Sequence, residues 1–289
     1  MTTRSATIDG VLLVDKPAGV TSHDVVAAAR RSLGIKRIGH TGTLDPFATG
    51  LLVLLLGKAT RLLPYVEGEP KVYEATIELG AETDSDDSTG TVIRTAEQPS
   101  EQDLRDAMRA LTGEIDQVPP VYSAKKVAGT RAYAAARRGT PLNLPSSRVT
   151  VHEWTWLRHG AGRLVTRISC SGGTYVRALA RDLGRLSGSA AHLSALRRTR
   201  SGTFEIANAV AFDGLGAGDA SPLDVRAAIP TLPTQDVSED EMRRVLHGNP
   251  IAARVDAPMV ALIEPNGSLV ALAARDGALL QPRVVLRDS

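Results

Sequence analysis

The most strongly apolar uninterrupted segment constrains the fold of this 289-residue chain more than any other feature. Residues 51–56, Leu-Leu-Val-Leu-Leu-Leu, lie between Gly50 and Gly57. A strand with this pattern is buried on both faces, so the sheet that contains it needs a covering layer on each side. The segment is far shorter than the ~20 residues that a helix needs to cross a bilayer, so we expect no membrane span.

Periodicity and capping residues predict both strands and helices along the rest of the chain. One helix begins at Thr21 or Ser22 and ends before Gly34. The other expected helices are Ser100–Gly113 and about Thr174–Leu186, and the other expected strands are Val11–Val14, Tyr73–Leu79, Val149–Leu157 and Leu164–Cys170. This mixture predicts an α+β fold.

The C-terminal part of the chain has the pattern of a small separate unit. A capping box at Ser238 predicts a short helix that ends at Gly248, and the turn at 265–267 joins two alternating strands. We therefore expect a catalytic or binding domain over residues 1–235 and a β-rich module over residues 236–289.

The net charge of +2 conceals an uneven distribution of charge. Residues 66–106 contain 3 Lys or Arg against 12 Asp or Glu, whereas residues 107–200 contain 16 against 4. Positive potential attracts polyanions and steers their approach, so nucleic acid is the first partner to consider. An arginine-rich face exposed to solvent explains the same counts equally well.

The sequence argues against several kinds of functional site. The single cysteine, Cys170, excludes an internal disulfide and a cysteine-based zinc site. The histidines show no paired ligand spacing, and neither G-x-x-x-x-G-K-[ST] nor G-x-S-x-G is present. The N-terminus lacks the apolar stretch of a signal peptide. We therefore expect a cytoplasmic protein that needs no metal and no cofactor.

The glycine-rich segment 39–50 can hold a reactive carboxylate. Pro46 favours an extended backbone at Asp45, and the glycines of the segment allow turns that side chains would block. An aspartate of ordinary pKa, ~3.9, is ionised at neutral pH and can act as a nucleophile. An aspartate that only caps a turn shows the same local pattern, so the residues alone leave both interpretations open.

The same segment, G-H-T-G-T-L-D-P-F-A-T-G, resembles the catalytic signature of the pseudouridine synthases, in particular the bacterial TruB family that modifies uridine 55 in the T-loop of tRNA. Further stretches match that family in order and spacing. They are V-D-K-P-A-G-V-T-S-H at 14–23, G-K-A-T-R at 57–61, K-V-Y-E-A at 71–75, T-D-S-D-D-S-T-G at 83–90, Q-V-P-P-V-Y-S-A-K-K at 117–126, C-S-G-G-T-Y-V-R-A-L at 170–179 and H-L-S-A-L-R-R at 192–198.

The resemblance implies a pseudouridine synthase fold, with a central mixed, largely antiparallel sheet flanked by helices, and a PUA-like RNA-binding module at the C-terminus. It makes Asp45 the catalytic aspartate, Arg177 the arginine that pairs with it, and Tyr73 the ring that stacks on the target base and acts as a base. The substrate-binding residues that it implies are His40, Asp87, Tyr175, Leu196 and Lys16.

The basic segment at about 120–148 falls where the family has an insertion that grips RNA. The resemblance and the net charge favour phosphate contacts over a merely solvated loop. The residues concerned are Lys125, Lys126, Arg131, Arg137 and Arg138.

The resulting hypothesis is a stand-alone isomerase that flips uridine 55 out of the T-loop and rearranges its glycosidic bond. The expected partner is tRNA, bound by a monomer that needs no guide RNA and no protein partner, since long basic terminal extensions are absent. A non-catalytic RNA-binding or RNA-folding protein and a glycoside hydrolase are the alternatives. Whether Asp45 attacks C1′, attacks C6 or promotes proton loss from C2′ stays open.

Overall fold

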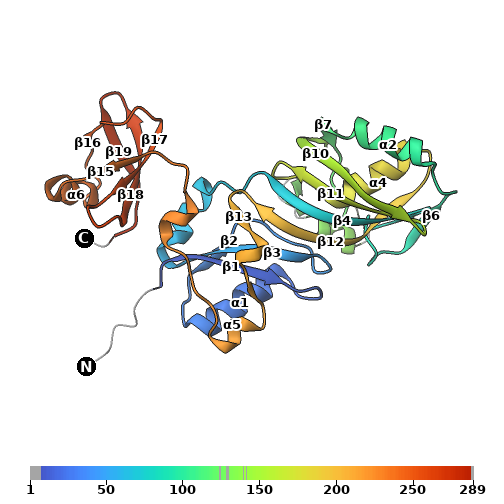
Figure 1. Cartoon of the computed structure of the whole chain (residues 1–289), viewed down its shortest axis with the longest axis horizontal. Coiled ribbons are helices and arrows are strands. Elements are labelled where there is room, and N and C mark those ends of the chain that lie inside the picture. The colour runs from blue at the N-terminus through green and yellow to red at the C-terminus, as the bar shows by residue number, and fades with distance from the viewer. Residues whose placement is uncertain (1–7, 124, 128–129, 139, 141, 288–289) are drawn as a thin grey trace.

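The computed structural model describes residues 8–287 except 124, 128, 129, 139 and 141, and for 126, 127, 130, 131, 134 and 137 it describes the backbone only. A ten-stranded sheet runs through most of the molecule (Figure 1). Its main path has the order β14-β1-β3-β12-β4-β11-β10-β7, with β2 paired to β3 and β13 paired to β12. These strands are β1 (Gly10–Lys16), β2 (Ile38–His40), β3 (Thr49–Leu56), β4 (Lys71–Leu79), β7 (Gly113–Gln117), β10 (Ser147–Gly160), β11 (Arg163–Cys170), β12 (Ala191–Ser201), β13 (Phe204–Glu205) and β14 (Val210–Ala211).

Most neighbouring strands of this sheet are antiparallel. The exceptions are β1 with β14 and β3 with β12, which pair in parallel. The predicted α+β class and the mixed, largely antiparallel sheet are therefore confirmed. Strand β12 was not predicted as a strand, because its buried arginine, Arg198, breaks the apolar alternation that marks one.

The apolar segment 51–56 is buried on both faces, as predicted. Leu52, Leu54 and Leu56 pack with helix α1 (Ser22–Leu33) and with Leu215 of α5 (Gly214–Ala217). Leu51, Val53 and Leu55 pack on the other side, with the 3₁₀ helix η1 (Gly57–Tyr65) and with apolar residues of the C-terminal module. Layers on both sides thus remove this strand from water.

Helices α2 (Glu101–Ala110) and α4 (Val176–Leu186) cover the sheet at the opposite end of the molecule (Figure 1). They form one hydrophobic cluster with β4, β11 and β12. The short strands β5 (Ala81–Thr83) and β6 (Val92–Thr95) pair with each other beside this cluster. The buried residues of β4 therefore pack against α4. The N-terminal end of β4 lies close to the N-terminal end of that helix.

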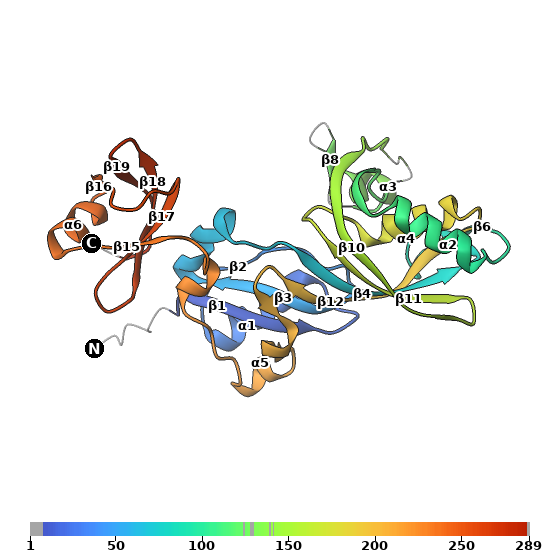
Figure 2. The ribbon, with the colours of Figure 1, turned by 45° about the horizontal axis from the view of Figure 1, so that its top comes forward.

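The basic segment 118–148 rises beside α4 (Figure 2). It contains β8 (Lys126–Val127), β9 (Thr130–Arg131) and the helix α3 (Ala132–Arg137). Tyr133 N donates to Ser123 O at 3.0 Å, and Ala132 N donates to Lys125 O at 2.8 Å. These bonds fold the segment back on itself above the sheet.

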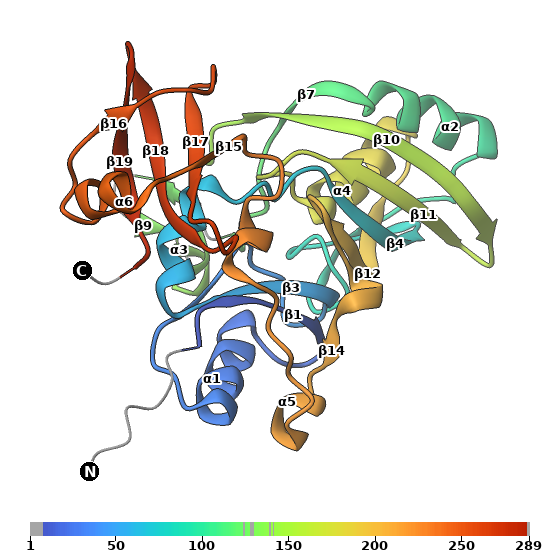
Figure 3. The same cartoon turned by 60° about the vertical axis from the view of Figure 1, so that its left-hand side comes forward.

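The C-terminal module is a five-stranded sheet of order β15-β17-β18-β19-β16, which is separate from the ten-stranded sheet (Figure 1; Figure 3 gives a second view). Its strands are β15 (Thr234–Asp236), β16 (Ile251–Ala252), β17 (Met259–Ile263), β18 (Leu269–Asp276) and β19 (Leu279–Val285). Its helix α6 (Glu239–Leu246) begins with the predicted capping box at Ser238. The sheet begins at Thr234, just before the expected boundary at 235/236. The connecting 3₁₀ helices are η2 (Ile206–Asn208) and η3 (Val225–Ala228). No described helix is long and apolar enough to cross a membrane.

Candidate active site

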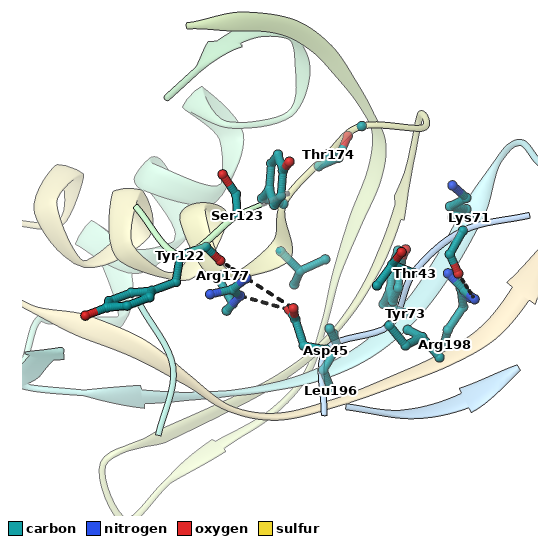
Figure 4. A pocket seen from close by; sticks show the side chains of 15 residues that line it. Thr43, Asp45, Lys71, Tyr73, Tyr122, Ser123, Thr174, Arg177, Leu196 and Arg198 are labelled. Carbon is teal, nitrogen blue, oxygen red and sulfur yellow. Dashed lines mark hydrogen bonds and ion pairs between the residues drawn. The ribbon is translucent and has the colours of Figure 1, made fainter. Parts of the chain in front are cut away.

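A cavity of about 310 Å³ is lined by residues of five segments that lie far apart in the sequence (Figure 4). The segments are 42–45, the start of β4, 122–123, 173–177 and the middle of β12. Five residues singled out in the sequence line this cavity. They are Asp45, Tyr73, Tyr175, Arg177 and Leu196.

Asp45 and Arg177 form an ion pair in this cavity. Arg177 Nη2 donates to Asp45 Oδ1 at 3.2 Å. Arg177 Nε lies 2.9 Å from Oδ2 without the alignment of a hydrogen bond. The Arg177 side chain is 6% exposed and the Asp45 side chain is 36% exposed. The carboxylate therefore reaches the cavity while the guanidinium holds it from the protein side.

Hydrogen bonds to the first helix hold the loop that carries Asp45. Leu44 N donates to Ser22 Oγ at 2.9 Å, and Ser22 Oγ donates to Leu44 O at 3.1 Å. Gly19 N donates to Pro46 O at 2.8 Å on the other side of the aspartate. The residues before and after Asp45 are thus both anchored.

Gly50 ends this loop at a very close approach between strands. Its φ is +102°, and a Cβ on Gly50 would lie 2.3 Å from Arg198 O. Only glycine permits this contact, which brings β3 against β12 in parallel. This contact fixes the position of the loop that carries Asp45 relative to β12, the strand that carries Leu196.

Burial raises the pKa of Asp45 above its ordinary value, and the nearby Asp87 raises it further, while Arg177 opposes both effects. The expectation of an ordinary aspartate pKa is thereby corrected. The carboxylate is a stronger base than a solvated aspartate, and its pairing with Arg177 favours the charged form that a nucleophile needs.

Tyr73 both lines the cavity and belongs to the hydrophobic core under α4. It is 7% exposed. Burial raises the pKa of its hydroxyl, although the neighbouring Arg198 guanidinium acts in the opposite direction. The hydroxyl therefore stays protonated at neutral pH and is suited to donate a hydrogen bond or a proton rather than to remove one.

Lys16 does not reach the cavity. It is fully buried, and its Nζ donates to the carbonyl oxygens of Pro17 at 2.9 Å, Val20 at 2.8 Å and Pro46 at 3.3 Å. All three contacts are to backbone, and binding of substrate by Lys16 stays a prediction. Its ammonium group instead joins the turn after β1 to the loop of Asp45. Burial lowers the pKa of Lys16 to about 8.

His40 also lies away from the lining of this cavity. Its ring meets that of His23 edge-on, with centroids 5.9 Å apart. Burial and the nearby His23 lower the pKa of His40, so the ring is neutral at pH 7. A contact between His40 and nucleotides remains a prediction.

A second cavity of about 690 Å³ adjoins the first and shares Asp45, Tyr122 and Arg177 with it. Asp87 lines this second cavity and lies 3.4 Å from Arg177 Nη1. Its Oδ1 accepts from Ser85 Oγ at 2.8 Å, from Thr89 N at 2.9 Å and from Thr89 Oγ1 at 2.5 Å. Asp87 is therefore held inside the acidic loop, with its other oxygen facing the guanidinium of Arg177.

The basic insertion is only partly described. Lys125 Nζ contacts Ser147 Oγ, and Arg138 is exposed. The side chains of Lys126, Arg131 and Arg137 lie outside the described residues. Phosphate binding by this set therefore stays a prediction.

Several residues of the site were missed from the sequence. Lys71 and Arg198 line the cavity beside Tyr73, and Tyr122 contributes from the start of the insertion. Burial and the Arg198 charge lower the pKa of Lys71. Arg198 is 1% exposed and donates to Leu51 O at 2.7 Å and to Gly42 O at 3.1 Å. All three residues belong to stretches that resemble the family. The resemblance could therefore have indicated them, although no role was predicted for any of the three.

Comparison with known proteins finds relatives over almost the whole chain. Residues 30–176 match the family model described as "TruB family pseudouridylate synthase (N terminal domain)", residues 177–224 match "tRNA pseudouridylate synthase B C-terminal domain", and residues 232–287 match "tRNA Pseudouridine synthase II, C terminal". A protein of Thermobifida fusca named tRNA pseudouridine synthase B is 46% identical, over 97% of this chain and 99% of the relative. A protein of the same name from Mycolicibacterium paratuberculosis is 42% identical, over 97% and 98% of the two chains.

Solved structures show the same fold. A chain of a Cbf5-Nop10-Gar1 complex is 26% identical, with a TM-score of 0.72 over 96% of this chain and 85% of that chain. A chain of an H/ACA ribonucleoprotein bound to a substrate RNA containing 2′-deoxyuridine is 25% identical, with a TM-score of 0.70 over the same shares of the two chains.

Proposed function

The chain belongs to the TruB family of pseudouridylate synthases, and we propose that it converts uridine 55 in the T-loop of tRNA to pseudouridine. The observation that carries this proposal is the ion pair of Asp45 and Arg177 at the wall of a cavity of about 310 Å³. A uridine stacked in an RNA loop is out of reach of a carboxylate in such a cavity. The target nucleotide must therefore leave the stack and enter.

In this reaction the bond between C1′ and N1 breaks and a bond between C1′ and C5 forms, while C5 loses a proton and N1 gains one. No atom is added or removed overall, whichever atom Asp45 attacks. Asp45 supplies the carboxylate that acts on the sugar–base unit, and Arg177 holds its direction.

The walls of the cavity suit a flat uracil ring. Tyr73 and Leu196 present apolar surface, and Tyr73 adds a hydroxyl that burial keeps protonated. An aromatic ring compensates part of the stacking that the base loses when it flips. The adjoining cavity at Asp87 and Tyr122 has room for a neighbouring nucleotide of the opened loop.

Asp87 distinguishes this site from that of a glycoside hydrolase. A glycoside hydrolase needs one carboxyl group free to donate a proton and a second that acts on the sugar. The oxygens of Asp87 face Ser85, Thr89 and Arg177 instead. Among the described residues, Asp45 is the only carboxylate that lines the first cavity, and this fits a rearrangement better than hydrolysis.

We further propose that residues 1–235 form the catalytic unit, that the insertion at 120–148 contacts RNA phosphates, and that the module at 236–289 contacts tRNA. The enzyme acts as a monomer in the cytoplasm without a guide RNA or a protein partner. The supporting observation is that one chain supplies both members of the Asp45–Arg177 pair and the other residues that line their cavity.

The test is incubation of the purified protein alone with an unmodified tRNA transcript, followed by mapping of pseudouridine along the RNA. Modification at position 55, and none in a transcript with cytidine at that position, is the expected result. A matched reaction with Asp45→Asn gives the background. Tight binding of the transcript without any product would show a binding protein and overturn the proposal.

A further inference from the structure

Three arginines recur at intervals of four residues along α4, and each meets acidic residues of the stretch 82–87. Arg177 pairs with Asp45 and Asp87, Arg181 with Asp86, and Arg185 with Glu82. Residues four apart lie on one face of a helix, so the three pairs form a row along α4. The row begins at the active site and leads away from it.

Arg181 is the middle member of this row, and each of its three guanidinium nitrogens donates one hydrogen bond. Its Nη1 donates to Asp86 Oδ2 at 2.9 Å, its Nη2 to Val118 O at 2.9 Å and its Nε to Asp182 Oδ1 at 2.8 Å. The side chains of Arg181 and Asp86 are 9% and 8% exposed. The pair is therefore buried, and its arginine is held through all three nitrogens.

Arg177 repeats the same arrangement one helical turn nearer the cavity. It donates through Nη1 to Ser85 O at 3.0 Å and through Nη2 to Tyr122 O at 3.0 Å. Each of the two arginines thus joins the acidic loop to residues 118–122, where the basic insertion begins. The acidic loop and residues 118–122 are thus joined twice, once by Arg177 and once by Arg181. Of these two arginines, only Arg177 contacts Asp45.

The backbone of Asp86 is also unusual. Asp86 has a φ of +61°, a backbone conformation that residues other than glycine rarely adopt. Its carbonyl oxygen accepts from Leu193 N at 3.0 Å, and its amide donates to Thr83 O at 3.2 Å. A rare conformation persists where the surroundings over-determine it, and here it points the carboxylate at Arg181.

A buried ion pair of this kind is weak evidence for stability, because the desolvation of both charges offsets much of their attraction. It does define one geometry, since among the described residues Asp86 has Arg181 within ion-pair distance, and Arg181 has Asp86 and its helix neighbour Asp182. The loop that it defines contains Ser85 and Asp87, the two residues that contact Arg177 from that side.

We propose that Asp86 and Arg181 are positioning residues for the reaction, which fix the acidic loop against α4 and thereby fix the direction in which Arg177 holds Asp45. The inference rests on the proposed function. It assigns a role to a pair that touches neither Asp45 nor the lining of the first cavity.

The test compares this pair with Glu82 and Arg185, the pair at the far end of the row. The variants are Asp86→Asn, Asp86→Asn/Arg181→Gln, Glu82→Gln and Glu82→Gln/Arg185→Gln. For each we would measure the single-turnover rate constant at saturating enzyme, the Kd for tRNA and the Tm. The double variants guard against an unpaired buried charge that prevents folding.

We expect both Asp86 variants to lower the rate constant about tenfold, with the Kd within twofold of wild type. The double variant should be no slower than Asp86→Asn alone, because the two residues act together. The Glu82 variants should change Tm and leave the rate constant unchanged. A purely structural role would change Tm in both pairs without slowing the folded enzyme.

Asp86 variants that react at the wild-type rate would overturn the inference, as would Glu82 variants that are slowed to the same extent. Wild-type protein that binds tRNA and forms no pseudouridine would instead overturn the proposed function, and this inference with it. The two failures are distinguished by the wild-type reaction.

Discussion

The arginines of α4 and β11 and the basic residues of the insertion belong to the same basic stretch of sequence, yet their surroundings differ. On α4 and β11 the arginines have acidic partners from residues 66–106. Besides the row on α4, Arg163 lies 2.9 Å from Glu78 and Arg167 lies 3.3 Å from Glu74. In the insertion, no carboxylate of the described residues lies within ion-pair distance of Lys125 or Arg138.

The difference shows that charge counted along a sequence does not measure positive potential on a surface. The acidic stretch 66–106 and the basic stretch 107–200 meet in the fold and neutralise each other in part. The interpretation of the whole basic stretch as an RNA surface is therefore too broad. The part suited to attract RNA is the insertion, and the paired part is suited to hold the site.

The largest expected effect concerns the paired region. Asp45→Asn removes the carboxylate that Arg177 holds and replaces it with an amide of nearly the same shape, which cannot act as a nucleophile. We expect no detectable pseudouridine, with tRNA binding within a few-fold of wild type. Single-turnover product formation and a separate Kd measurement check this. Appreciable turnover by the variant would contradict the role of Asp45.

The second effect concerns Tyr73, whose hydroxyl lies by the buried Arg198 of the same basic stretch. Tyr73→Phe keeps the ring and removes the hydroxyl, so we expect normal binding and a chemical step slowed by ~10²–10⁴-fold. Tyr73→Leu should in addition weaken binding by ~1–3 kcal/mol, because the base no longer stacks on an aromatic ring.

Single-turnover kinetics of the two Tyr73 variants, with Tm as the control for folding, separate these contributions. The Tm is needed because Tyr73 also packs in the core. If both variants react at the wild-type rate, Tyr73 is only a core aromatic.

The third effect concerns the insertion. Lys125→Gln/Arg138→Gln should weaken tRNA binding and lower the slope of log K against log salt by ~0.7–0.9 for each phosphate that the variant no longer neutralises. The matched control is Arg163→Gln/Arg167→Gln, which removes the same charge from the paired region and should leave the slope nearly unchanged. Equal slopes for the two double variants would contradict the contrast between the regions.

The smallest effect is on stability. Arg163 and Glu78 form an exposed pair, with side chains 61% and 30% exposed. A double-mutant cycle with Arg163→Gln and Glu78→Gln should give a coupling of about 0.2–1 kcal/mol. Urea unfolding at low and high salt measures it, and the coupling should shrink at high salt. A larger, salt-independent value would show that the pair shapes the sheet.

Local sequence patterns predicted those elements that carry a local signal. Thr21 and Gly34 bound α1 as expected, and the turn at 265–267 joins β17 and β18. Strand β12 was missed because a buried arginine occupies one of its inward positions. The roles of Asp45, Tyr73 and Arg177 came from the resemblance, since no local pattern distinguishes them from an ordinary turn, strand or helix residue.

Contacts between segments far apart in the chain could not be predicted from the sequence. Asp86 and Arg181 are 95 residues apart, and nothing around either residue indicates the other. The backbone contacts of Lys16 were missed for a related reason. Its three carbonyl partners become neighbours only when the turn after β1 and the loop of Asp45 fold together.

The place of β12 in the sheet has a consequence for the order of folding. This strand lies between β3 and β4, although it follows both by more than a hundred residues in the sequence, and it pairs with β3 in parallel. A chain emerging from the ribosome must hold these two strands without their common neighbour until residue 201 is made. Pairing of distant segments is slow. Enzyme activity should therefore return in the last phase of refolding, after most of the helical signal has recovered.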